Sequence, residues 1–155
     1  MPPVTNPQMG GGFDPSKDIV TTGQIQASGQ IRSIGTGINS GVGYATGAGA
    51  VVTQLTNRTT SVTINAPCGA ITTNNASLAV ETSAAFTVNC SAVEIGDVPV
   101  VAQRSGSNSG NTDVIVSAVA AGSFQISVVN NNAAGGTAET GAIVINYAII
   151  KAVAS

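Results

Sequence analysis

The sequence contains no histidine and no tryptophan, and only 8% of its residues are charged, against about 25% in a typical soluble domain. Without histidine the chain lacks the usual general base at neutral pH and the commonest transition-metal ligand. Ser-His-Asp and Cys-His arrangements therefore cannot form within one chain. Two cysteines alone cannot close a tetrahedral zinc site. We expect a protein that is not an enzyme and that uses no cofactor.

Positive charge is scarce as well as scattered. The five basic residues are Lys17, Arg32, Arg58, Arg104 and Lys151. They form no stripe that could neutralise phosphates, so we expect no nucleic-acid partner. The same scarcity argues against electrostatic binding to a membrane surface, and no apolar run approaches the ~18 residues needed to span a bilayer. The sequence therefore predicts neither a nucleic-acid nor a membrane partner.

The carboxylates form no recognisable catalytic or metal-binding pattern. Of the seven acidic residues, Glu94 and Asp97 lie closest together, but they occupy a turn with Asp97 leading into a strand. The stretch Ser107–Asp113 carries polar ligands but lacks the spacing and closing glutamate of an EF-hand. We interpret this stretch as a solvated loop.

Cysteine number and the first residues bear on the compartment. Cys68 and Cys90 are interpreted as two buried thiols, with a single disulfide between strands as the alternative. The opening stretch 1–7 has no basic region followed by an apolar one, so we expect no signal peptide and synthesis in the cytoplasm.

Most of the chain alternates between apolar and polar residues. Hydrophobic residues make up 43% of the sequence, and the period of two from residue 51 onward is typical of strands with one buried face. Turn-forming Gly, Asn, Pro and Ser clusters separate the alternating runs. We expect strands at 51–55, 61–65, 69–73, 84–89, 98–103, 112–120, 123–130 and 141–153. The pattern predicts an all-β chain whose residues 51–155 form a β-sandwich or jelly-roll-like domain.

Two segments of different character precede this domain. Residues 1–22 hold four of the six prolines and a triple glycine, and we interpret them as an extended arm with Phe13, Pro15 and Ile19 as candidate anchors; a floppy terminus is the alternative. In residues 23–50 glycine recurs every six residues, with Ile25 and Ile31 at equivalent positions. Such a period predicts a repeated β segment, and a glycine-rich linker remains possible.

The last expected strand is apolar on both faces. Ile143, Ile145, Tyr147 and Ile149 share one face, and Val144, Ala148 and Ile150 share the other with Asn146, so both faces are mostly apolar. Both faces should be covered, either because the strand is central in a monomer or because a neighbouring subunit packs on it. We expect a homo-oligomer, with candidate interface residues Ile25, Ile31, Ile145, Tyr147 and Ile149.

Three stretches suggest a resemblance to a known group of proteins. They are 43–54 (GYATGAGAVVTQ), 68–72 (CGAIT) and 145–151 (INYAIIK). Together these stretches resemble a β-module common in virion proteins of tailed bacteriophages, over about residues 41–153. Such modules occur in capsid decoration (cement) proteins and in fibre or spike proteins, commonly as trimers. The resemblance implies a structural protein of the virion and carries over no catalytic or metal-binding residue.

The leading hypothesis is a homotrimeric decoration protein on the capsid surface, with the major capsid protein as partner. The short chain favours this over a tail fibre, which normally has a long shaft. A tail fibre, spike or receptor-binding tip is the second hypothesis. A carbohydrate-binding domain is the third, and it is disfavoured because the chain has two tyrosines, three phenylalanines and no tryptophan to stack on sugars.

Overall fold

The computed structural model describes residues 36–37 and 41–152. The chain divides into the units Met1–Val42 and Gly43–Ser155, and the described residues of the second unit form eight strands and no helix. The strands are β1 (Gly49–Thr53), β2 (Val62–Thr63), β3 (Cys68–Thr72), β4 (Thr82–Asn89), β5 (Val98–Ser105), β6 (Thr112–Ala120), β7 (Ser123–Asn130) and β8 (Val144–Ile150). The expectation of an all-β fold with eight strands is confirmed for the described residues.

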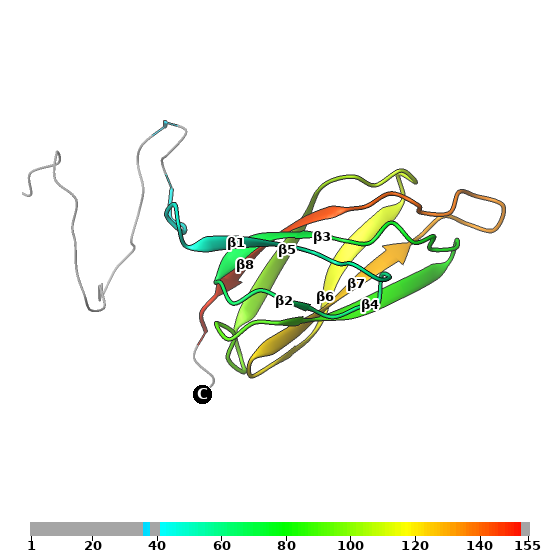
Figure 1. The fold of residues 1–155 in the computed structure, drawn as a ribbon. Helices are drawn as coiled ribbons and strands as arrows, with labels where there is room; N and C mark the ends of the chain where they lie inside the picture. Colours follow the sequence, from blue (N-terminus) through cyan, green and yellow to red (C-terminus); the bar gives the residue numbers. More distant parts are fainter. Residues whose placement is uncertain (1–35, 38–40, 153–155) are drawn as a thin grey trace, which may run out of the picture. The chain divides into compact units, whose positions relative to one another are not determined.

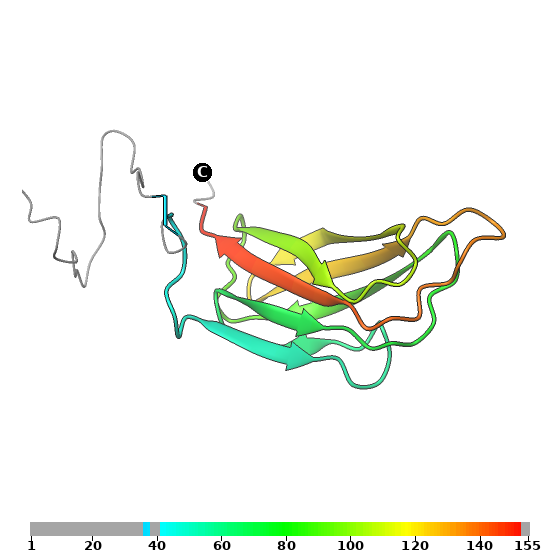
Figure 2. The same ribbon diagram turned by 90° about the horizontal axis from the view of Figure 1, so that it is seen from above.

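The strands form two mixed four-stranded sheets. Sheet A has the order β1-β3-β8-β5, and sheet B has the order β2-β4-β7-β6. The short β1 and β2 pair in parallel with β3 and β4, and all other pairs are antiparallel. The two sheets stack as the layers of a β-sandwich, as Figures 1 and 2 show from two directions. Strand β8 is therefore a central strand, hydrogen-bonded on both sides.

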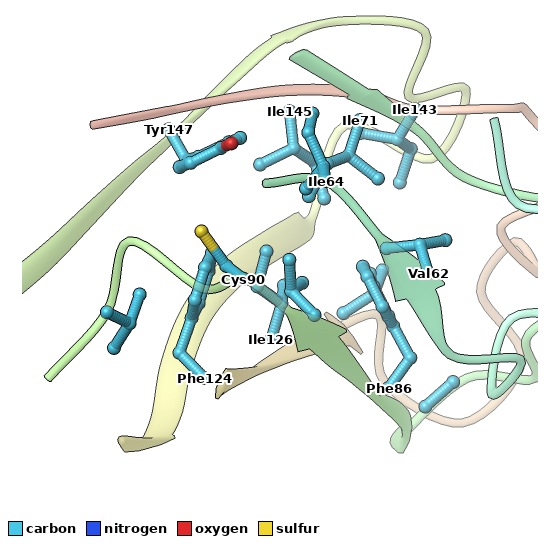
Figure 3. Packing of buried hydrophobic residues seen from close by; sticks show 14 of the residues in the cluster. Val62, Ile64, Ile71, Phe86, Cys90, Phe124, Ile126, Ile143, Ile145 and Tyr147 are labelled. Atoms are coloured by element: carbon cyan, nitrogen blue, oxygen red, sulfur yellow. The ribbon is translucent and has the colours of Figure 1, made fainter. Parts of the chain in front are cut away.

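Alternation along the strands builds the core between the layers. In sheet B the side chains of Phe86, Phe124 and Ile126 point inward, and all are buried. In Figure 3 they lie opposite Ile145 and Tyr147 of β8 in sheet A. The ring of Phe124 approaches that of Tyr147 with centroids 5.5 Å apart and planes at 47°, a tilted geometry that aromatic pairs favour. These contacts hold the two sheets together.

Several strands differ in length from the sequence-based expectation. Strand β2 has two residues rather than five because it pairs only with Val88 and Asn89 at the end of β4, and the Ile64 backbone amide makes the last hydrogen bond to Asn89 at 2.9 Å. Strand β8 begins at Val144 rather than Gly141 because residues 141–142 cross closely over Gly106. A Cβ at Gly106, whose φ is +98°, would overlap the carbonyl oxygen of Ala142. Strands β6 and β7 have the expected bounds.

Edge strand β1 depends on glycine at position 69. Ala50 and Gly69 are register partners, and a Cβ at Gly69 would overlap the carbonyl oxygen of Ala50. The backbone amide of Gln54, just after β1, donates a hydrogen bond to the carbonyl oxygen of Thr72 at 2.8 Å. This bond therefore reports whether β1 is attached to β3.

We predict that Gly69→Ala detaches β1 while the remaining sheet stays folded. Overpacking of this kind costs about 1–3 kcal/mol, so hydrogen exchange at the Gln54 amide should accelerate about tenfold or more. Gly43→Ala is the control, because a Cβ there meets no atom within 4 Å. Unchanged protection of the Gln54 amide in the folded Gly69→Ala variant would contradict the prediction.

Candidate functional site

Four charged residues of the sandwich, Arg58, Asp97, Glu139 and Lys151, are engaged in structural contacts. Asp97 accepts hydrogen bonds from the Glu94 amide at 2.8 Å and from Lys151 Nζ at 2.5 Å. The hydrogen bond from Lys151, followed by that from the Glu94 amide, lowers the pKa of the Asp97 carboxyl. Asp97 thereby ties the turn before β5 to the end of β8. Among residues 36–37 and 41–152, no three His, Cys, Asp or Glu side chains gather as metal ligands would.

The two cysteines are not bonded to each other. Cys90 is buried in the core, and its thiol lies 3.3 Å from the carbonyl oxygen of Ala66. Cys68, at the start of β3, is partly buried. The free thiols agree with the first interpretation of the pair, although Cys68 is less buried than expected.

A buried carboxylate organises the loops at one end of the sandwich. Glu139 is fully buried and accepts hydrogen bonds from Ser107 Oγ at 2.7 Å, Thr112 Oγ1 at 2.8 Å and the Gly141 amide at 2.6 Å. Burial acts to raise the pKa of this carboxyl, but the hydrogen bonds outweigh it and lower the pKa to about 2. Because the donors come from the β5–β6 and β7–β8 connections, Glu139 joins these two loops.

Arg58 performs a similar task for the neighbouring loops. Its guanidinium is buried and donates to the carbonyl oxygens of Ala76 at 2.5 Å and Gly141 at 2.8 Å. Burial lowers the pKa of Arg58, and the nearby charge of Glu139 acts in the opposite direction. No buried side-chain nitrogen or oxygen of the described residues lacks a hydrogen-bond partner. The cluster is thus a satisfied structural network.

The outer face of sheet A is largely apolar, and the one charged residue in its four strands is Arg104, which lies at the bulge of β5. The outward residues of β1, β3, β8 and β5 form cross-strand rows. From one end to the other these rows are Val98-Ile150, Val100-Ala148-Cys68-Gly49, Ala102-Asn146-Ala70-Val51 and Ser105-Val144-Thr72-Thr53. Four large side chains stand out into solvent, with exposures of 83% at Val51, 57% at Ile150, 51% at Val98 and 47% at Val100.

A hollow of about 380 Å³ lies at the β1 edge of this sheet, lined by Gly49, Ala50, Val51, Gly69 and Ala70. All five are small or apolar, and the hollow contains no polar side chain that could orient a small-molecule ligand. The hollow is therefore a shallow depression in the surface of sheet A rather than a ligand site.

The outer face of sheet B is polar by contrast. Its rows carry hydroxyl and amide side chains, and Gln125 Oε1 accepts a hydrogen bond from Ser117 at 2.9 Å. Ser127 in turn donates to Ser117 at 3.1 Å. Among the described residues, Ile115 is the one large aliphatic side chain on this face that is about half exposed to solvent, at 49%. Sheet B thus has the solvated face expected of a sandwich, and sheet A does not.

Three of the expected interface residues lie in the core of the sandwich. Ile145, Tyr147 and Ile149 are buried in the core of their own chain, because β8 turns this face toward sheet B. They are core residues rather than residues presented to a neighbouring subunit. The opposite face of β8, with Val144, Ala148 and Ile150, is the one that faces outward.

The remaining candidate residues cannot be placed. Phe13, Pro15, Ile19, Ile25 and Ile31 lie outside the described residues. Sequence reasoning also missed Arg58 and Glu139 as organisers of the loops. The scarcity of charged residues was an available signal, because only 8% of the chain is charged and charged residues are seldom buried without a partner. The sequence, however, indicates no partner for either residue.

Comparison with protein-family models, with curated proteins and with solved structures found no match for this chain. Within the described residues, no helix is long and apolar enough to span a membrane.

We predict that Glu139 contributes to stability at neutral pH and that this contribution is lost in acid. Its pKa falls from an ordinary 4.5 to about 2 on folding, so the stabilisation is complete above pH 4.5 and disappears as the pH falls toward 2. The shift corresponds to on the order of 3 kcal/mol. Urea unfolding between pH 2 and 7 should show Glu139→Gln to be less stable at pH 7.

Between pH 2 and 7 the free energy of unfolding should depend less steeply on pH in Glu139→Gln than in the wild type. It should not become flat, because the pKa of Asp97 is lowered too. Glu94→Gln, with an exposed side chain, is the control and should follow the wild type. An unchanged pH profile in Glu139→Gln would show that this carboxylate is not a stabilising anion.

Proposed function

We propose that the chain is a structural protein of a tailed-bacteriophage virion, made in the host cytoplasm and placed on the capsid surface. In this role it is a homotrimeric decoration protein whose partner is the major capsid protein. One observation carries the proposal. The three stretches that resemble phage virion modules coincide with β1, β3 and β8, which lie side by side in sheet A.

The composition of that sheet supports an assembly role. Its outer face is largely apolar, with Val51, Val98, Val100 and Ile150 exposed, and the largest exposed apolar patch of a soluble protein often marks an interaction site. The network around Glu139 and Arg58 serves the fold, and the charged pair at Asp97 does the same. What the sandwich offers to a partner is therefore a surface rather than a reactive group.

The proposed topology is jelly-roll-like. Strand β3 pairs with β8, and β4 pairs with β7, so the pairing is nested along the chain. Nested antiparallel pairs distributed over two sheets are the feature that supports this description. A rigid sandwich of this kind suits a protein that must hold its shape on a shell.

The proposed mechanism is cementing. Residues 1–22 would lie across neighbouring capsid subunits, with Phe13, Pro15 and Ile19 as anchors, and residues 23–50 would connect this arm to the sandwich. Each bridge between capsid subunits adds buried area that opposes expansion of the shell. The scarcity of charge is tolerable in a protein that functions while packed in an assembly.

A tail fibre, spike or receptor-binding tip is the second candidate. The β5–β6 and β7–β8 connections favour it, because they present exposed amides and hydroxyls at one end of the sandwich, among them Asn108, Asn111 and Thr140. Copy number separates the two roles. Quantitative mass spectrometry of purified particles should find as many copies as capsid subunits, to the order of magnitude, for a decoration protein and a small fraction of that for a tail protein.

We predict that deletion of residues 1–18 abolishes binding to capsids and leaves the sandwich folded. Co-sedimentation with heads purified from the virus that encodes the chain measures the binding. Phe13→Ala should weaken the binding, since an aromatic anchor carries a large share of the contact energy. Undiminished co-sedimentation of the truncated protein would exclude the arm as the capsid-binding element.

A further inference from the structure

We propose that copies of this chain associate through the outer face of sheet A. The inference deepens the proposed homotrimer and rests on it for the choice of partner. The surface is defined by the four cross-strand rows described above, with Val51, Val98, Val100 and Ile150 as its exposed apolar side chains. Covering these side chains removes apolar surface from water, at about 25 cal/mol per Å².

The outer face of sheet A differs in composition from the outer face of sheet B. Both faces belong to four-stranded sheets of one sandwich, and both alternate inward and outward residues in the same way. Sheet B fills its outward positions with residues such as Thr87, Gln125 and Ser127, as water requires. Sheet A fills most of the equivalent positions with valine, isoleucine and alanine, and the others with Asn146, Cys68, Gly49, Thr53, Thr72 and Ser105. A difference of this kind within one fold indicates that sheet A is covered in the working state.

The scarcity of charge on this face points to a second copy as the occupant. The four rows contain no Asp, Glu, Lys or Arg, and Arg104 lies at the bulge of β5 beside the last row. Most of the face can therefore meet that of another copy without repulsion between like charges. A partner with a charged surface would have to bury charges against valine side chains, which is costly. The central polar group, Asn146, is exposed, and its amide is both donor and acceptor. Asn146 side chains of neighbouring copies can therefore satisfy one another.

The shape and size of the face fit a sheet-on-sheet contact. The small residues Gly49, Ala70 and Ala148 leave grooves between ridges formed by the larger ones. Pleated faces interdigitate in this way when sheets pack about 10 Å apart. The four strands have five, five, seven and eight residues and cover about 400 Å² in projection. In the proposed homotrimer three such faces meet around the threefold axis, so together they can bury about 1,200 Å².

A matched pair of charge substitutions tests the proposal on the full-length chain. Val100 on sheet A and Ile115 on sheet B are equally exposed, at 47% and 49%, and each lies on a strand at the edge of its sheet. Analytical ultracentrifugation should find the wild type and Ile115→Glu as oligomers of the same size. Val100→Glu should shift to monomer, with the dissociation constant raised at least a hundredfold. Circular dichroism and thermal unfolding confirm that each variant is folded.

The outcomes decide the proposal either way. A wild type that is monomeric at high concentration overturns it, as does an oligomer that Val100→Glu leaves intact or that Ile115→Glu dissociates equally. If Val100→Glu fails to fold, Val51→Lys takes its place, because Val51 is 83% exposed on edge strand β1. Capsid binding is not measured in these experiments. An oligomer that does not bind capsids would therefore count against the proposed function alone.

Discussion

The register of β8 is the constraint on which the rest of the sandwich depends. This strand pairs with both β3 and β5, so it sets which residues of three strands face inward. With Ile145, Tyr147 and Ile149 inside, sheet A gains the side chains that pack on Phe86, Phe124 and Ile126 of sheet B (Figure 3). A slip of one residue would exchange the two faces. That exchange is unfavourable, because Tyr147 would leave the core and Asn146 would enter it.

The polar cluster at the loop end holds the same register from outside the strands. Glu139 and Arg58 bind backbone groups of several connections, and the close crossing of Gly106 and Ala142 lies beside them. A buried carboxylate without its donors would carry a large desolvation penalty, so the loops are ordered together or not at all. The start of β8 therefore cannot shift without breaking this network. Core packing and loop chemistry thus specify one arrangement.

Once β8 is placed, the character of the outer faces follows. The apolar face toward sheet B is used within the chain, and the second apolar face of β8 is directed outward beside Val100 of β5 and Ala70 of β3. Sheet B differs because its central strand β7 carries Ser123, Gln125 and Ser127 on the outside. The sandwich is consequently one-sided in its chemistry, with a solvated layer and a layer suited to self-association. This asymmetry links the fold to the proposed role in a symmetric assembly.

The sequence by itself determined the fold class, the number of strands and the bounds of β6 and β7, because alternation and turn residues are local signals. It also revealed that 143–150 is apolar on both faces. Only the tertiary structure decided which of those faces is core, since that depends on pairing with β3 and β5 from distant parts of the chain. The interface assignment of Ile145, Tyr147 and Ile149 therefore failed, while Val144, Ala148 and Ile150 face outward. The roles of Arg58 and Glu139 were hidden for the same reason, because their partners are separated by up to 83 residues.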